Sequence, residues 1–467
     1  PANAQTFLQA RLSGDTYTGF RKAPGYDGTR DSEISRYNAS VLSVNPATGG
    51  VTTSALNKGI TVKSQSVGLE FHNELAGGFT IDDKFRYSDN KTAFQAQFWD
   101  VQTLANLLGT SGQTAKYYNG PLAGQAVTAA NLATGLVSKG AAINTQSPDM
   151  GNVFNDLSVS KQLKFDIGTL DIKGGWFHGT QNVKQRWSIS ERVMAAGRDG
   201  ALIDLYAANG AALTSAGLTG YNNQWGCCAR DIDAKFTTDA PYLSLNLASG
   251  PFDVDAGVRH ETFRSKGVYA GPKQVPGGLD VNGDGKIDGA ETNVFVADMA
   301  NPGKVDYKIH YTSYSLGLNY RLNNDLSLFV RHSKGYRAVA DRLLFSPFID
   351  TATGALTAYG KTIAAAPVKQ SEIGLKFRGR TDMVNYNIAA TLFKSTSEEY
   401  SYDQTRQDDP NKPGFQGPKL DVRGYKATGL ELETGATVGN LGLNANLVYS
   451  DETLASSLFN PASVGKT

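Results

Sequence analysis

Apolar and polar residues alternate along much of the chain, in pairs of segments joined by tight turns. Val67, Leu69 and Phe71 are separated by polar residues, a turn falls near 75–78, and the alternation resumes over 79–87. Successive side chains of a β-strand point to opposite faces of a sheet, so this pattern predicts a β-hairpin with one apolar and one polar face.

The same unit recurs five more times along the chain. Its tight turns fall near 165–169, 248–251, 321–325, 379–382 and 435–440. Long segments separate the hairpins, near 89–152, 179–235, 264–304, 334–366 and 399–420. Connections in compact domains are usually about 4–6 residues long, so these long segments are unusual.

Two kinds of all-β protein compete for this pattern. A soluble β-sandwich would bury its apolar faces in a core. A transmembrane barrel would turn them toward lipid, with short turns on one rim and long extracellular loops on the other. The strict alternation of tight and long connections favours the second class. We therefore predict an antiparallel, up-and-down, transmembrane β-barrel.

The barrel prediction assigns each face of the strands. The expected aromatic girdle at the lipid boundary is Tyr87, Tyr314, Tyr320 and Tyr449. The residues expected to face the lumen are polar and of mixed charge: Arg331, Glu372, Lys376, Arg378, Asn385, Asn387, Glu431, Glu433, Asn444 and Asn446. A solvated surface has the same composition, so this second set predicts orientation and no chemistry.

Composition adds a few exclusions. Lys and Arg number 45 and Asp and Glu 44, so the charge shows no nucleic-acid surface. The longest apolar runs fall short of the roughly 18–20 residues of a spanning helix. The chain opens on Pro1 with no signal peptide, which suggests a mature form or a fragment. The only cysteines, Cys227 and Cys228, lack zinc-ligand neighbours, and the sequence leaves open whether they are oxidised.

One stretch, LDVNGDGKIDGAE (279–291), has the ligand spacing of an EF-hand-type calcium loop. The predicted ligands are the side chains of Asp280, Asn282, Asp284, Asp288 and Glu291 and the carbonyl of Lys286. Gly285 takes the sharp turn, and GPKQVPGGL before the loop excludes the first helix of a sensor EF-hand. We expect calcium to order a long extracellular loop; an Asp- and Gly-rich loop without metal is the alternative.

Several segments of the second half resemble the barrel of TonB-dependent outer-membrane receptors. They are LNYRLNNDLSLFVRHSKGYRA (318–338), PVKQSEIGLKFRGR (367–380), VNYNIAATLFKS (384–395) and YKATGLELE (425–433), and WGCCARDIDAKFTTDAPYLSLNL (225–247) is similar to a segment of some members. The resemblance implies a barrel of about 22 strands, closed by a plug and importing scarce, bulky nutrients with energy from the TonB complex.

The chain departs from that family in three respects. It shows no recognisable plug or TonB box, it ends on LFNPASVGKT, and its pattern gives roughly 13 or 14 strands. We therefore expect residues 1–467 to be a partial barrel without the plug and the final strands.

The sequence gives three alternatives for function. The first is TonB-coupled uptake of a siderophore, a cobalamin-like compound or an oligosaccharide across the outer membrane. The others are a passive porin of about 16–18 strands and a secreted calcium-binding β-protein. No enzyme is expected, because the five histidines (72, 178, 260, 310, 332) have no catalytic spacing. Helices are expected within 192–217, and candidate ligand contacts by composition are Phe98, Trp99, Tyr117, Tyr118, Trp187, Tyr206, Tyr221, Trp225, Tyr400 and Tyr402.

Overall fold

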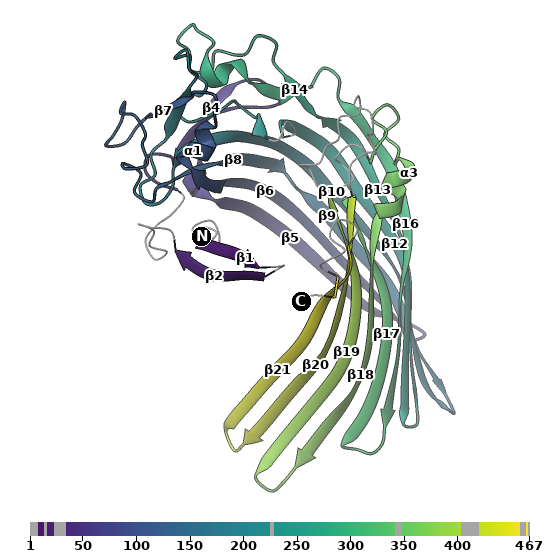
Figure 1. Cartoon of the computed structure of the whole chain (residues 1–467). Coiled ribbons are helices and arrows are strands. Elements are labelled where there is room, and N and C mark those ends of the chain that lie inside the picture. Colours follow the sequence, from purple (N-terminus) through teal and green to yellow (C-terminus); the bar gives the residue numbers. More distant parts are fainter. Residues whose placement is uncertain are drawn as a thin grey trace.

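The computed structural model describes residues 8–13, 16–22, 34–224, 228–340, 348–402, 420–457 and 464–465. One antiparallel sheet of 13 strands dominates it (Figure 1). Its strands are β5 (Ile60–Leu75), β6 (Phe79–Thr103), β8 (Leu136–Asp149), β9 (Asn152–Phe165), β10 (Gly168–Ala195), β12 (Arg230–Ser249), β13 (Phe252–Ala270), β16 (Gly303–Arg321), β17 (Leu326–Ala338), β18 (Ala365–Arg380), β19 (Val384–Tyr402), β20 (Leu420–Val438) and β21 (Leu441–Ser456).

Small elements gather mainly at the end of the sheet opposite the tight hairpin turns (Figure 1). The helices are α1 (Leu104–Leu108), α3 (Ala358–Ile363) and the 3-10 turns η2 (Leu56–Lys58) and η4 (Gly289–Thr292). The two-stranded sheets pair β1 (Leu8–Ser13) with β2 (Thr16–Lys22), β3 (Ser40–Val44) with β4 (Val51–Ala55), β7 (Thr114–Tyr117) with β11 (Ile203–Tyr206), and β14 (Pro272–Gln274) with β15 (Phe295–Ala297). No helix among the described residues is long and apolar enough to cross a membrane.

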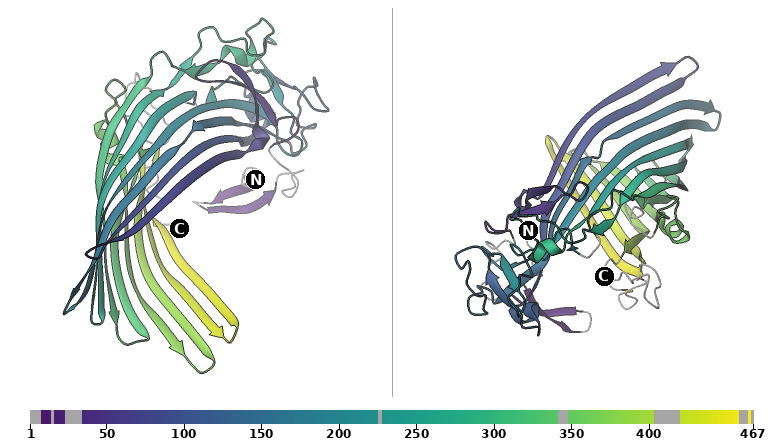
Figure 2. Two further views of the ribbon diagram at one scale, coloured as in Figure 1. Left: turned by 180° about the vertical axis from the view of Figure 1, so that it is seen from behind. Right: turned by 90° about the horizontal axis from the view of Figure 1, so that it is seen from above.

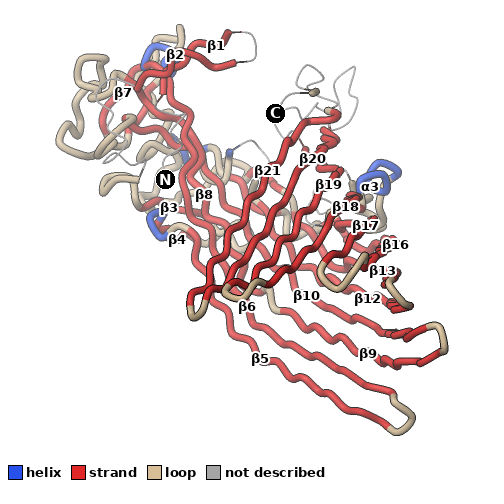
Figure 3. The backbone as a smooth tube through the Cα atoms, turned by 90° about the horizontal axis from the view of Figure 1, so that it is seen from below, coloured by secondary structure: helices blue, strands red, loops and turns tan. Residues whose placement is uncertain are grey.

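All six predicted hairpins are confirmed. They are β5–β6, β9–β10, β12–β13, β16–β17, β18–β19 and β20–β21. Neighbouring strands follow each other around a strongly curved sheet whose described edges are β5 and β21 (Figures 2 and 3). Strands β8 and β9 both pair with β6 and β10. They therefore occupy the same place in the sheet, end to end, with a break at Met150 and Gly151.

The apolar face of the strands is exposed, and this observation distinguishes a transmembrane barrel from a soluble β-sandwich. Leu69 is 68% exposed, Leu316 56% and Leu443 57%, and the four tyrosines of the predicted girdle are exposed as well. A β-sandwich would bury these side chains in its core. The soluble sandwich therefore does not fit, whereas a sheet that turns this face toward lipid does.

The predicted long loops were too long, because strands extend into each of them. Strand β10 continues to Ala195, β6 to Thr103 and β19 to Tyr402, and β8 lies wholly within the segment 89–152. The helices expected over 192–217 were also wrong: the segment holds the end of β10 and the strand β11. The remaining connections, such as 104–135 and 271–302, are still far longer than the hairpin turns.

Strand β16 shows why the strands are longer than the alternation predicts. From Tyr314 to Tyr320 the even-numbered residues are apolar and exposed, whereas from Val305 to Ile309 the odd-numbered residues are apolar and buried. The apolar side chains therefore change face near Thr312. The apolar residues that precede Thr312 pack against a cluster from the connection before β18, which includes Phe348 and Ile363.

Candidate functional site

The residues predicted to face the lumen do share one face of the sheet. The register places Arg331 opposite Glu372, Arg378 opposite Asn387, and Glu433 opposite Asn446. In an antiparallel pair, residues opposite one another point the same way. This polar face is the reverse of the exposed apolar face.

A hollow of about 950 Å³ lies on this polar face, close to the tight turns of β16–β17 and β18–β19. Its charged lining contains both signs: Asp253, Asp255, Arg321, Asp325, Arg331, Glu372, Lys376 and Arg378. Arg331 pairs with Asp255 at 3.2 Å, and Arg321 lies 3.7 Å from Asp253. Opposite charges thus neutralise one another across strands, and the hollow has no single sign that would select an anion or a cation.

The histidines do not form a catalytic group in the described part of the chain. All five pair with a polar side chain on the adjacent strand, and Nδ1 of His72 lies 2.7 Å from Asp82. Of the other four, Nδ1 of His178 lies 2.7 Å from Asp239, and His260, His310 and His332 contact Thr312, Thr262 and Ser371 at 2.9–3.0 Å. By register, these four lie on the apolar face where its apolar residues give way to polar ones. On these strands the apolar band ends at the four histidines, on the side of the long connections.

The aromatic residues considered as ligand contacts have mixed positions. Phe98, Trp99 and Trp187 lie on strands and not in loops. Trp99, Tyr117, Tyr221 and Tyr400 are buried, so packing accounts for them, whereas Phe98 and Tyr118 are exposed. Trp225 lies outside the described residues, as does Cys227; Cys228 is disulfide-bonded.

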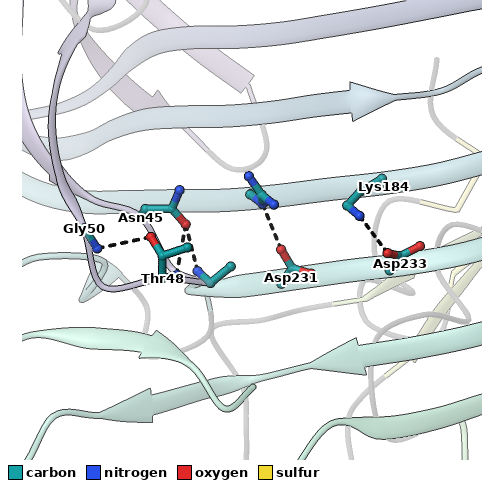
Figure 4. A network of polar contacts seen from close by, with 8 residues as sticks. Asn45, Thr48, Gly50, Lys184, Asp231 and Asp233 are labelled. Carbon is teal, nitrogen blue, oxygen red and sulfur yellow. Dashed lines mark hydrogen bonds and ion pairs between the residues drawn. The ribbon is translucent and has the colours of Figure 1, made fainter. Parts of the chain in front are cut away.

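Three segments far apart in the sequence form an assembly at the loop-rich end, which we call the outer cap. It comprises residues 40–58, 214–224 and 275–297, whose apolar side chains share one buried cluster: Val41, Val44, Leu56, Leu218, Tyr221, Val281, Ala290 and Val294. The turn of β3–β4 is closed by its own polar contacts, shown in Figure 4 together with the Lys184–Asp233 pair of β10 and β12.

Asn222 holds the outer cap together. Its side chain is fully buried, donates to the carbonyls of Val44 and Phe295 at 2.9 Å, and accepts a hydrogen bond from Ser188 of β10. Its backbone adopts φ 55°, a left-handed conformation that Asn tolerates better than most residues. One amide thus connects the cap segments to the sheet.

Arg192 of β10 makes a second connection to the outer cap. It is buried and donates to the carbonyls of Asn38 and Ser40 at 2.8 Å each. Burial lowers the pKa of Arg192 to about 10, because removing the guanidinium from water disfavours its charged form.

The predicted calcium loop lies in this cap, between β14 and β15. The structure brings together three of the predicted ligands: carboxylate oxygens of Asp280, Asp284 and Glu291 all lie within 4.8 Å of one another. Asp288 does not join this group and is exposed. Asn282 lies beside it and donates to Asp284 at 3.4 Å. Strand β14 stands before the loop, where a sensor EF-hand has its first helix, and the short η4 ends the loop.

The three carboxylates differ in their surroundings. Asp280 accepts backbone N–H bonds from Gly283 and Gly285 at 2.7 and 2.9 Å, and Asp284 is exposed. Glu291 is only 1% exposed, and its Oε1 accepts from the N–H groups of Val281 and Asn282. Its Oε2 is buried and has no hydrogen-bond partner in the described part of the chain. The sequence spacing identified these residues, but not the burial of Glu291.

A family model described as "TonB dependent receptor-like, beta-barrel" matches residues 3–467. The comparison with curated proteins finds no match. Similar solved structures include the ferric-catecholate import receptor Fiu of E. coli K12 in its closed form (11% identity, 85% of this chain and 48% of that chain, TM-score 0.49). They also include the siderophore receptor PiuA of Acinetobacter baumannii (13%, 85% and 48%, 0.48) and P. aeruginosa FpvA bound to heterologous pyoverdines (13%, 92% and 44%, 0.43).

The chain thus spans less than half the length of these three receptors. The family resemblance predicted from the sequence is confirmed by the family model, which covers nearly every residue. The chain belongs to the TonB-dependent receptor β-barrel family.

Proposed function

We propose that this protein is the barrel of an outer-membrane receptor that takes up a scarce, bulky nutrient with energy from the TonB complex. The family match over residues 3–467 carries the proposal. The nutrient classes that the family resemblance suggests are siderophores, cobalamin-like compounds and oligosaccharides.

The dimensions of the apolar band support a position in a membrane. On β19 the side chains of one face are apolar or aromatic from Val384 to Leu392, and the next residue on that face is Lys394. A tilted strand needs about 9–11 residues to cross the hydrocarbon core, and the segment 384–392 is close to that length. On β16 the band runs from Tyr320 to Tyr314, so a tyrosine stands at each end, as in the aromatic girdles of outer-membrane barrels.

The loop-rich end supports a role in capturing ligand. The outer cap joins three segments through a buried cluster, so its surface is held by the sheet below it. Pre-organised surfaces of this kind lose little conformational entropy when they bind a ligand. We propose that the outer cap contacts the nutrient before it enters the barrel.

A passive porin is the second candidate, and energy dependence separates the two. The test is uptake by cells that express the receptor in its natural outer membrane, compared with a deletion strain. The probes are iron-55 complexes of catecholate and hydroxamate siderophores, labelled cyanocobalamin and labelled maltooligosaccharides. We expect one of them to enter by a saturable route that a protonophore or loss of TonB abolishes. Uptake that is unaffected by either treatment would favour the porin.

A further inference from the structure

The buried carboxylate of Glu291 lacks a counter-charge in the described part of the chain. Among the residues that the structure describes, no Lys, Arg or His lies within ion-pair distance of it, and one of its two oxygens has no hydrogen-bond partner. Taking an ionised carboxylate out of water costs several kcal/mol unless a cation or hydrogen bonds compensate it. A cation bound at this position would compensate a charge that no described residue neutralises.

Two further carboxylates surround the same point. Oxygens of Asp280 and Asp284 lie within 4.8 Å of that of Glu291, and like charges at this separation repel each other. Glu291 forms the buried floor of the group and exposed Asp284 its open side, so an ion can enter from the solvent. Gly283 and Gly285 adopt φ 77° and 81°, which lets the chain turn tightly around this point.

We propose that residues 280–291 bind one calcium ion, and that the ion fastens the outer cap. The donors are all oxygens, which selects a hard cation and not zinc or copper. A flexible loop that can add the amide of Asn282, the carbonyl of Lys286 and water suits the six to eight ligands of calcium. It suits the strict octahedron of magnesium less well.

The ligands adjoin the buried cluster of the cap directly. Asp280 precedes buried Val281, and Glu291 follows buried Ala290. The N–H of Ala290 donates to Oγ of Ser215 at 3.1 Å, which connects the loop to the segment 214–224. Binding at Glu291 therefore stabilises contacts among the cap segments, and loss of the ion leaves a buried charge among them.

Tyr221 shows the same proximity. It is buried in the cluster, and its N–H donates to the carbonyl of Asn293 at 2.9 Å. Burial raises the pKa of Tyr221, and the negative charge of Glu291 adds to this increase. The carboxylate is thus close enough to influence the cap segment 214–224 electrostatically.

The test uses the receptor purified in detergent micelles. Terbium luminescence, excited through nearby tyrosines and displaced by CaCl₂, measures the affinity, and limited proteolysis with and without EGTA measures the order of the cap. The variants are Glu291→Gln and Asp284→Asn, with Asp298→Asn as matched control, because Asp298 pairs with Lys273 outside the loop. We expect a Kd of about 10⁻⁴–10⁻³ M for the unaltered protein. Both loop variants should bind at least about tenfold more weakly, since each removes one charged ligand.

Proteolysis gives an independent result. EGTA should increase cleavage within 275–297 in the unaltered protein and the control, whereas Glu291→Gln should be cleaved equally with and without calcium. Absence of terbium or calcium binding up to about 10 mM, ten times the weak end of that range, would overturn the proposal. So would an unchanged affinity in Asp284→Asn, whose exposed side chain makes misfolding no explanation. Tighter binding of magnesium than of calcium would overturn the choice of ion. None of these results depends on the proposed transport.

Discussion

A single arginine can test whether the exposed apolar face meets lipid. Leu316 lies on β16 between Tyr314 and Tyr320 on that face, and Ser315 lies next to it on the opposite face. Arginine on a barrel's lipid face costs about 2–4 kcal/mol at the middle of the membrane and about 0–1 kcal/mol near its surfaces. Leu316 stands opposite His332, where the apolar run of β17 ends. Leu316→Arg should therefore lower the free energy of unfolding by about 1–2 kcal/mol, roughly a 5- to 30-fold change in the folding equilibrium.

Ser315→Arg is the matched control, with the same added charge one residue away. It stands opposite Gly257 and Ser333, where space and polar neighbours can receive a guanidinium. Changes at such positions usually stay within about 0.5 kcal/mol. Equilibrium urea unfolding in phospholipid vesicles, followed by tryptophan fluorescence, measures both variants. Equal effects, or a neutral Leu316→Arg, would refute the assignment of this face to lipid.

Three further substitutions test the loop-rich end. Burial raises the pKa of Asp204 in the folded protein. The contribution of this carboxyl to stability is therefore present at low pH and is lost as the pH rises through the raised pKa. Asp204→Asn should make Tm change less between about pH 4 and 7, as measured by scanning fluorimetry. Asn222→Ala leaves three hydrogen-bond partners unsatisfied, at about 1–3 kcal/mol each, and should lower Tm. An unchanged Tm would show that Asn222 does not hold the cap segments to the sheet. Gly278→Ala places a Cβ 2.2 Å from the carbonyl of Glu291 at φ +83°, so it should weaken calcium binding and destabilise the cap by about 1–3 kcal/mol, checked by terbium titration and protease sensitivity.

The hairpins were predictable because each is specified locally. Alternation fixes the face of every side chain, and Gly-rich or Asn-rich turns such as 76–78 and 322–325 fix where the chain reverses. The strand ends were not predicted, since the alternation changes phase partway along. In β16 the apolar residues are odd-numbered from Val305 to Tyr311 and even-numbered from Tyr314 to Tyr320. The missed signal was that change of phase, which looks like the end of a strand.

The candidate site divides in the same way. The ligand spacing of the calcium loop is local, and three of the residues that it predicts, Asp280, Asp284 and Glu291, lie close together in the structure. The burial of Glu291 comes with the fold: its neighbour Ala290 shares a buried cluster with Tyr221 and Val44, which are distant in sequence. Asn222 carried no signal of its role, because an Asn at left-handed φ is visible only once the backbone is known. Long-range contacts of this kind follow from the fold and not from a motif.

The change of phase has a consequence for how the receptor holds its outer surface. From Tyr314 to Tyr320, strand β16 exposes its apolar residues on one face of the sheet. From Val305 to Ile309, it buries its apolar residues on the other face. The buried residues of β16 thus support the connecting segment that contains Phe348 and Ile363. The outer cap packs through a separate buried cluster, and in it the buried Oε2 of Glu291 has no hydrogen-bond partner among the described residues. Calcium at that point would complete a surface that the strands have already positioned.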